Sequence, residues 1–233
     1  MVDDETDGVG VDLLTCDGGF AVDGDENFQE ELLRQLVLDQ FLMGLMVVRQ
    51  GGAFVCKLFD AFTPVTVALL YVLYREFDRI SIVKPYTSRP ANSERYAARC
   101  HAVTVGGEAK AHGQTALGTR TRSPWHVPHH SYVVAVGLRK RQPPVTQFLF
   151  EVNDAFNALK ASGGGAKKGF GAVEDGLPDI LSLLPDDVLR ADEVFYEYLR
   201  QSNLAIVQEQ VDALELLYKY IEDTYVVTEA VGT

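Results

Sequence analysis

Hydrophobic residues follow an alternation of strand and helix patterns along the first part of this chain. Short β-branched and aromatic runs predict strands, and apolar residues at helical spacing predict the helices between them. In the first helix this spacing joins Leu33, Val37 and Phe41. Alternating strands and helices of these lengths predict an α/β domain with a largely parallel sheet. The predicted strands are 11–15, 53–59 and 79–83, and the predicted helices are 26–49 and 64–77.

The pattern changes at residue 97. Residues 97–131 are rich in Gly, Arg and Pro and contain all five histidines and the only tryptophan. Further on, the sequence predicts a strand at 132–138 and helices at 145–160, 192–201 and 204–223. We therefore expect four segments: an acidic tail at 1–10, a domain at 11–160 interrupted by an insertion at 97–131, a flexible glycine-rich loop at 161–176, and helices of the same domain at 177–225.

Composition narrows the class of protein. The hydrophobic and charged contents, 47% and 23%, are ordinary for a globular protein. The net charge of −12 argues against tight nonspecific binding to a phosphate backbone, although a local basic cleft could still hold a short RNA end. No apolar run approaches the roughly 20 residues of a membrane-spanning helix. An acidic start and only three cysteines, Cys16, Cys56 and Cys100, favour an intracellular protein with reduced thiols.

Four sequence blocks carry a more specific signal. They read VDLLTCDGGF at 11–20, GGAFVCKLFD at 51–60, KPYTSRPANSERY at 84–96 and YVVAVGL at 132–138. In order and spacing these blocks resemble the FtsJ-like 2′-O-methyltransferases, specifically the family of cap-specific mRNA (nucleoside-2′-O)-methyltransferases. The resemblance extends over about 11–96 and 132–224. It implies a Rossmann-like, S-adenosylmethionine-dependent methyltransferase fold followed by C-terminal helices.

The resemblance also implies catalytic residues. The family uses a Lys-Asp-Lys-Glu tetrad, and its Asp, second Lys and Glu match Asp17, Lys57 and Glu94. These residue types suit the reaction, because a ribose 2′-hydroxyl is a poor nucleophile that must lose its proton as it attacks the methyl group. A neutral lysine can accept that proton. Two carboxylates can orient the lysine and the hydroxyl, and Asp17 would also border the cofactor.

The same resemblance implies contacts to the capped 5′ end of mRNA. The family's loop after the motif aspartate binds the cationic methylguanosine, and the matching residues are Glu26, Asn27 and, less directly, Gln29. Asn92 resembles the contact to the first nucleotides of the transcript, and Ser88 and Arg89 are candidates for binding phosphate. Capping of the following helix by Asp25 or Asn27 is an alternative role for this loop. A cap-modifying function implies a nuclear location, with the cytoplasm as the alternative.

Two features depart from the family pattern. The family's first tetrad lysine and glycine-rich adenosyl-binding turn precede the motif aspartate, yet only 16 residues precede Asp17. We therefore expect a fold without its first strands, and a second chain that supplies the N-terminal half is one way to complete it. The insertion at 97–131 could be a basic RNA-contacting loop or an unrelated insertion. Zinc binding by His126, His129 and His130 is least favoured, because no cysteine or carboxylate stands at ligand spacing, and no metal site is expected.

Three functions remain open from the sequence. The first is methyl transfer from S-adenosylmethionine to the ribose 2′-hydroxyl of the first transcribed nucleotide of capped RNA. The second is an inactive or split module that binds the RNA end and needs a partner. The third is a ribosomal RNA 2′-O-methyltransferase on the same fold.

Overall fold

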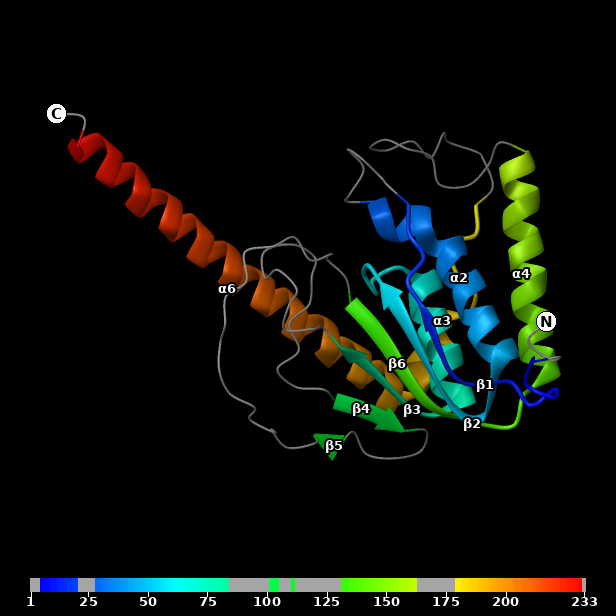
Figure 1. The fold of residues 1–233 in the computed structure, drawn as a ribbon. Helices are drawn as coiled ribbons and strands as arrows, with labels where there is room; N and C mark the ends of the chain where they lie inside the picture. The colour runs from blue at the N-terminus through cyan, green and yellow to red at the C-terminus, as the bar shows by residue number, and fades with distance from the viewer. Residues whose placement is uncertain are drawn as a thin grey trace.

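The computed structural model describes residues 5–20, 28–83, 101–104, 110–111, 131–162 and 179–231. These residues form a six-stranded sheet with helices against it, in the strand order β1-β2-β6-β3-β4-β5 (Figure 1). The strands are β1 (Val11–Cys16), β2 (Val48–Leu58), β3 (Phe77–Val83), β4 (His101–Thr104), β5 (Lys110–Ala111) and β6 (Ser131–Leu138). The sequence predicted β1, β2, β3 and β6, whereas β4 and β5 lie inside the expected insertion.

The sheet is mixed, so the prediction of a largely parallel sheet is wrong. β1 and β2 are parallel, but β6 is antiparallel to both β2 and β3. β3 therefore runs in the same direction as β2 without touching it, and β6 fills the position between them. Hydrophobic periodicity identifies a strand but carries no information about its direction, because the alternation of faces is the same either way.

The helices are α2 (Gln29–Val47), α3 (Pro64–Glu76), α4 (Pro143–Ala161), α5 (Asp186–Ala191) and α6 (Glu193–Val231). α3 begins as predicted, with Thr63 as N-cap and Pro64 in the first turn. α2 begins after Phe28, its N-cap, and the two capping candidates from the sequence, Asp25 and Asn27, lie outside the described residues. The two predicted C-terminal helices are one helix. Asn203 lies within it, and its side chain donates a hydrogen bond to the Ala61 carbonyl, 2.9 Å away.

The hydrophobic core lies between α2, α3 and one face of the sheet. Phe54 and Cys56 of β2 face the helices, in register with Ala135 and Val133 of β6. Phe41 of α2 packs edge-on against Phe54, with ring centroids 5.7 Å apart. All five of these side chains are buried. Burying an apolar side chain of this size stabilises the fold by roughly 1.5–3 kcal/mol.

The first part of α6 belongs to the same core. Phe195 packs against Tyr71 and Tyr74 of α3, and the Tyr198 hydroxyl accepts a hydrogen bond of 2.7 Å from the Ile82 amide of β3. Beyond Asn203 the helix extends away from the sheet (Figure 1). None of the described helices is both long enough and apolar enough to cross a membrane.

Candidate active site

The candidate site lies where two parallel strands end side by side. Cys16 and Cys56 are paired in register, so Asp17, which follows β1, lies next to Lys57 near the end of β2. The Lys57 Nζ atom is 2.8 Å from the Asp17 Oδ1 atom. Open α/β sheets bind their ligands at this carboxyl edge.

The two members of this ion pair differ in exposure. The Lys57 side chain is 9% exposed, whereas that of Asp17 is 65% exposed. The Phe59 ring lies under the lysine, with its centroid 5.4 Å from Nζ. Burying an ammonium without partners would be costly, and here the carboxylate and the ring face compensate for the lost water. The Lys57 amine is therefore held in place at the carboxyl edge of the sheet, beside the solvent-exposed Asp17.

Glycines after β1 leave space around this amine. A Cβ atom added to Gly19 would meet the Phe59 ring at 3.5 Å and Lys57 Nζ at 3.8 Å. The Gly18 amide donates a hydrogen bond of 2.8 Å to Gln40 Oε1 on α2. The sequence analysis did not single out Gln40, which lies between Val37 and Phe41 in the first predicted helix. The signal that could have identified it is a polar residue at a helical position where an apolar one is expected.

Neighbouring side chains stay neutral for physical reasons. Burial raises the pKa of Cys56, and the nearby Cys16 and Asp17 raise it further, while Lys57 opposes them. Burial also raises the pKa of the Cys16 thiol. Tyr132, the register partner of Lys57 on β6, has a pKa raised by burial and then by Asp17. The two thiols are therefore poor nucleophiles, and the Tyr132 phenol keeps its proton at neutral pH.

The loop after β2 is tied to the start of α2. The Glu30 carboxylate accepts hydrogen bonds from the Phe62 amide, the Thr63 amide and the Thr63 hydroxyl, at 2.8–3.1 Å from Oε1. Gln29, a predicted cap contact, is the first residue of α2 beside this clamp. The clamp joins the beginning of α2 to the loop that follows Lys57.

The structure brings Asp17 and Lys57 together, and the catalytic roles that the resemblance implies for them stay predictions. Apart from Gln29, the other predicted site residues lie outside the described residues, and these are Glu26, Asn27, Ser88, Arg89, Asn92 and Glu94. The same holds for His126, His129 and His130. Within the described ranges, His, Cys, Asp and Glu side chains form no group that could hold a metal ion.

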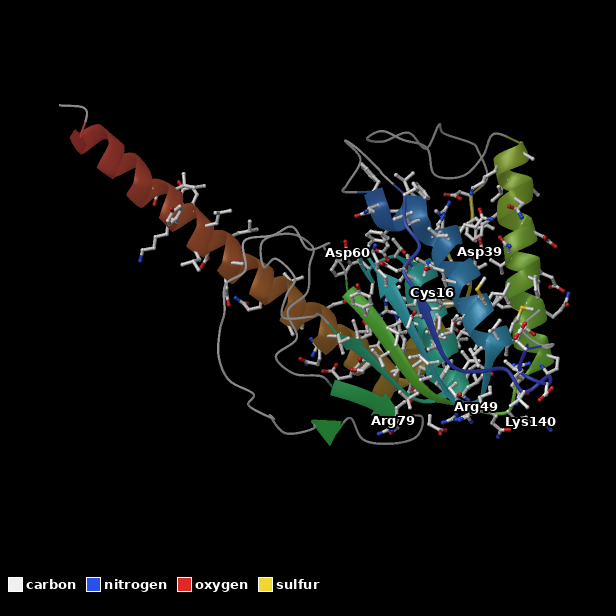
Figure 2. All side chains as sticks on the ribbon, viewed as in Figure 1. Cys16, Asp39, Arg49, Asp60, Arg79 and Lys140 are labelled. Carbon is white, nitrogen blue, oxygen red and sulfur yellow. The ribbon has the colours of Figure 1, made fainter. Side chains whose placement is uncertain are left out.

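The opposite end of the sheet carries basic side chains. Figure 2 shows Arg49, Arg79 and Lys140 there, far from Asp60, which follows β2. Arg49 pairs with Asp12, and Arg141 donates a hydrogen bond to the Val48 carbonyl at the start of β2. These cations are therefore remote from the candidate site and do not contribute to it.

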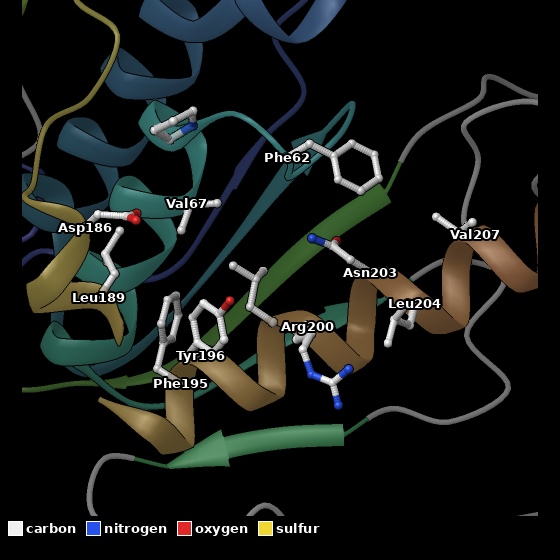
Figure 3. A pocket seen from close by; sticks show the side chains of 12 residues that line it. Phe62, Val67, Asp186, Leu189, Phe195, Tyr196, Arg200, Asn203, Leu204 and Val207 are labelled. Carbon is white, nitrogen blue, oxygen red and sulfur yellow. The ribbon is translucent and has the colours of Figure 1, made fainter. Parts of the chain in front are cut away.

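A separate hollow of about 370 Å³ lies among α3, α5 and α6 (Figure 3). Its walls are mainly apolar, and they include Phe62, Leu189, Phe195 and Leu199. Neither Asp17 nor Lys57 lines it. We assign no chemistry to this hollow.

Comparison with known proteins gives consistent results. Residues 1–100 match a family model described as FtsJ-like methyltransferase. The chain is 37% identical over 221 residues to cap-specific mRNA (nucleoside-2′-O-)-methyltransferase 1 of Xenopus laevis, and 36% identical to the protein of that name from Homo sapiens. It is 34% identical over 216 residues to cap-specific mRNA (nucleoside-2′-O-)-methyltransferase 1A of Caenorhabditis briggsae.

These alignments are unequal in coverage. They include 92–95% of this chain but only 19–20% of each relative. The chain thus spans about one fifth of the length of the curated relatives that it matches.

Proposed function

We propose that this chain contributes to a cap 2′-O-methyltransferase, because residues 1–100 match the FtsJ-like methyltransferase family and the whole chain is similar to cap-specific relatives, in line with the resemblance of its motifs. The proposed reaction is methyl transfer to the ribose 2′-hydroxyl of the first transcribed nucleotide of capped RNA. The observation that carries the proposal is the buried Lys57 amine, 2.8 Å from Asp17 at the carboxyl edge of the sheet.

In this proposal Lys57 is the proton acceptor. After its ammonium has released a proton to solvent, the amine would accept the proton of the 2′-hydroxyl, and Asp17 would pair with the ammonium that forms again. The rigidity of β2 and the Phe59 ring hold Nζ in position, which lowers the cost of reaching the reactive geometry. Glu94 is proposed as the third member, by resemblance.

S-adenosylmethionine is the proposed cofactor, and when bound it supplies a methyl group on a positively charged sulfur. The residues present fit the reactive end of such a molecule. Asp17 offers an exposed carboxylate, Phe59 offers a ring, and Gly19 leaves the space beside Lys57 free of a side chain. A carboxylate and an aromatic face both attract a cation. Asp17 would therefore border the cofactor as well as the lysine.

Recognition of the capped 5′ end is proposed for residues that resemble the family's RNA contacts. Glu26, Asn27 and Gln29 would contact the cationic methylguanosine. Asn92 would contact the first nucleotides, and Ser88 and Arg89 a phosphate. The Glu30 clamp supports a role for the start of α2, because it fixes Gln29 relative to the loop after Lys57. Action on capped transcripts would imply a nuclear location.

Further strands of the enzyme are proposed to pair with β1. Among the described strands, β1 pairs with β2 alone, and it forms one edge of the sheet. Leu13 on this strand is 54% exposed, and an apolar open edge is a strong template for pairing. A second chain, or another part of a longer polypeptide, could supply the strands. This pairing would complete the cofactor site.

Substitution of Lys57 tests the mechanism. In an enzyme completed by fusion or by a partner chain, Lys57→Ala should lower the rate of methyl transfer by at least ~10²-fold, as expected for loss of a positioned general base. Lys57→Arg should lower it almost as much, because a guanidinium keeps its charge and cannot accept the proton. Single-turnover transfer to capped RNA measures the rate, and a parallel titration measures RNA affinity, which should change little.

Lys140→Ala is the matched control, since this exposed lysine lies at the opposite end of the sheet (Figure 2). Near-normal turnover by Lys57→Arg would contradict proton transfer and leave Lys57 only a positioning role. Binding of capped RNA without methyl transfer by the completed protein would favour the RNA-binding module instead.

A further inference from the structure

One buried amide of α2 supports the loop that carries Asp17. We propose that Gln40 is a positioning residue that holds Asp17 against Lys57 through the backbone of Gly18. The catalytic meaning of this role rests on the proposed function. The contact itself is a property of the fold and can be tested without methyl transfer.

The Gln40 side chain is fixed at both ends of its amide. Its Oε1 atom accepts the hydrogen bond from the Gly18 amide at 2.8 Å, and its Nε2 atom donates to the Leu36 carbonyl at 3.2 Å. The residue is only 8% exposed. A buried amide with both its oxygen and its nitrogen engaged cannot turn without leaving a polar group unsatisfied, which is costly.

Gly18 is shaped for this contact. A Cβ atom added there would lie 3.0 Å from Gln40 Oε1 and 3.1 Å from its Cδ atom. A side chain at this position would therefore require the Gln40 amide to shift by a few tenths of an ångström. Glycine at this position allows the loop to approach the helix closely enough to form the hydrogen bond.

Asp17 needs such support more than Lys57 does. Lys57 is held within β2, which is hydrogen-bonded to β1 on one side and to β6 on the other. Asp17 lies beyond the last residue of β1, and its side chain is mostly exposed. The next residue, Gly18, donates its amide hydrogen bond to Gln40 of α2. The helix is well anchored there, because Leu38 and Phe41, close to Gln40 in sequence, are fully buried. The rigid helix thus fixes the loop, and the loop fixes the carboxylate.

Gln35 provides a matched control on the same helix. It is also buried, at 9% exposed, but its amide donates to Asn153 and Asn157 of α4 rather than to the loop after β1. Gln35→Leu and Gln40→Leu therefore make the same chemical change at similar burial. Gln40→Glu retains an acceptor oxygen for the Gly18 amide but loses the donor to the Leu36 carbonyl, so it tests the Gly18 hydrogen bond by itself.

The test measures two properties of the full chain. Amide hydrogen exchange of Gly18 reports the hydrogen bond to Gln40. A small acylating reagent modifies Lys57 at a rate that depends on whether Asp17 stays paired with the amine. Mass spectrometry measures this rate relative to that of Lys140 in the same digest. The Asp17→Asn variant serves as the reference, because it gives the labelling rate of Lys57 without the negative charge of Asp17.

Gln40→Leu should lose the Gly18 protection and raise the Lys57 labelling rate at least threefold, toward that of Asp17→Asn. Gln35→Leu should change neither. Gln40→Glu keeps the acceptor for the Gly18 amide but loses the donor to the Leu36 carbonyl, so it should restore Gly18 protection at least in part. Retained Gly18 protection in Gln40→Leu would overturn the proposal, as would unchanged Lys57 labelling after the protection is lost. The proposal would also be overturned if Gln35→Leu changed Gly18 protection and Lys57 labelling as much as Gln40→Leu does, because a general loosening of α2 would then explain both variants. If the exchange and labelling results are as expected but the completed protein transfers no methyl group, only the proposed function is refuted.

Discussion

At the scale of single residues, burial changes the ionisation of side chains outside the candidate site. Burial raises the pKa of Glu76 at the end of α3 above its usual value of 4.5, although Arg139 and Arg75 oppose the effect. Burial likewise raises the pKa of Asp39 on α2, against a smaller effect of Lys160. In both cases desolvation of the carboxylate outweighs the attraction of the neighbouring cations.

Glu76→Gln should therefore stabilise the protein at neutral pH. A raised pKa means that the native state binds the proton more tightly than the unfolded state. The stability from Glu76 is then complete below about pH 4.5 and is lost as the pH rises through the folded value. The variant should unfold at higher urea concentration than the wild type at pH 7, and the advantage should disappear below pH 4.5. Glu151→Gln on the exposed face of α4 should give no such pH-dependent gain.

At the scale of elements, the close approach of α2 to β2 depends on a glycine. A Cβ atom on Gly44 would lie 2.9 Å from the ring of Phe54. That ring is fully buried and already packed edge-on against Phe41, so it has little room to move. The helix can therefore bury its apolar face at this distance only where position 44 has no side chain.

Gly44→Ala should destabilise the protein, even though alanine is the better helix former. The substitution gains up to about 1 kcal/mol of helix propensity, whereas overpacking a well-filled core typically costs ~1–3 kcal/mol. We expect a net loss of about 1 kcal/mol in the free energy of unfolding, measured by chemical denaturation. Met43→Ala, an exposed position on the same helix, should change it by much less. A stabilised Gly44→Ala variant would show that the helix can shift away from the strand.

At the scale of the whole molecule, the chain consists of a packed α/β body and a helix that projects from it. The first turns of α6 are anchored by Phe195, Tyr198 and Leu199, which are all buried. Further along the same helix, Leu214, Leu217 and Ile221 are exposed. The stability of the body should therefore depend on the anchored turns alone.

Removal of residues 210–233 should leave the melting temperature of the body almost unchanged. The deleted segment contributes helical content but no buried core side chain among the described residues. Phe195→Ala, at the anchored end of the same helix, should instead cost about 3–5 kcal/mol. Calorimetry and circular dichroism of both variants would measure this difference. A large drop in melting temperature on truncation would show that the projecting segment stabilises the body.

The sequence by itself determined the local elements and identified candidate site residues at two strand ends. Alternating and helical spacing located β1, β2, β3, β6 and three of the helices, because side-chain periodicity follows directly from backbone geometry. Thr63 and Pro64 marked the start of α3 for the same local reason. The motifs around Asp17 and Lys57 indicated an FtsJ-like methyltransferase, since these motifs are continuous in sequence.

Only the tertiary structure decided how these pieces meet. The antiparallel insertion of β6 between β2 and β3 depends on contacts between residues far apart in the chain. The same is true of Gln40, whose partner Gly18 precedes it by 22 residues. A polar side chain on an apolar helix face has no meaning until a backbone amide from another element lies opposite it. Local patterns cannot contain that information, because the hydrogen bond forms only when the sheet and the helix pack together.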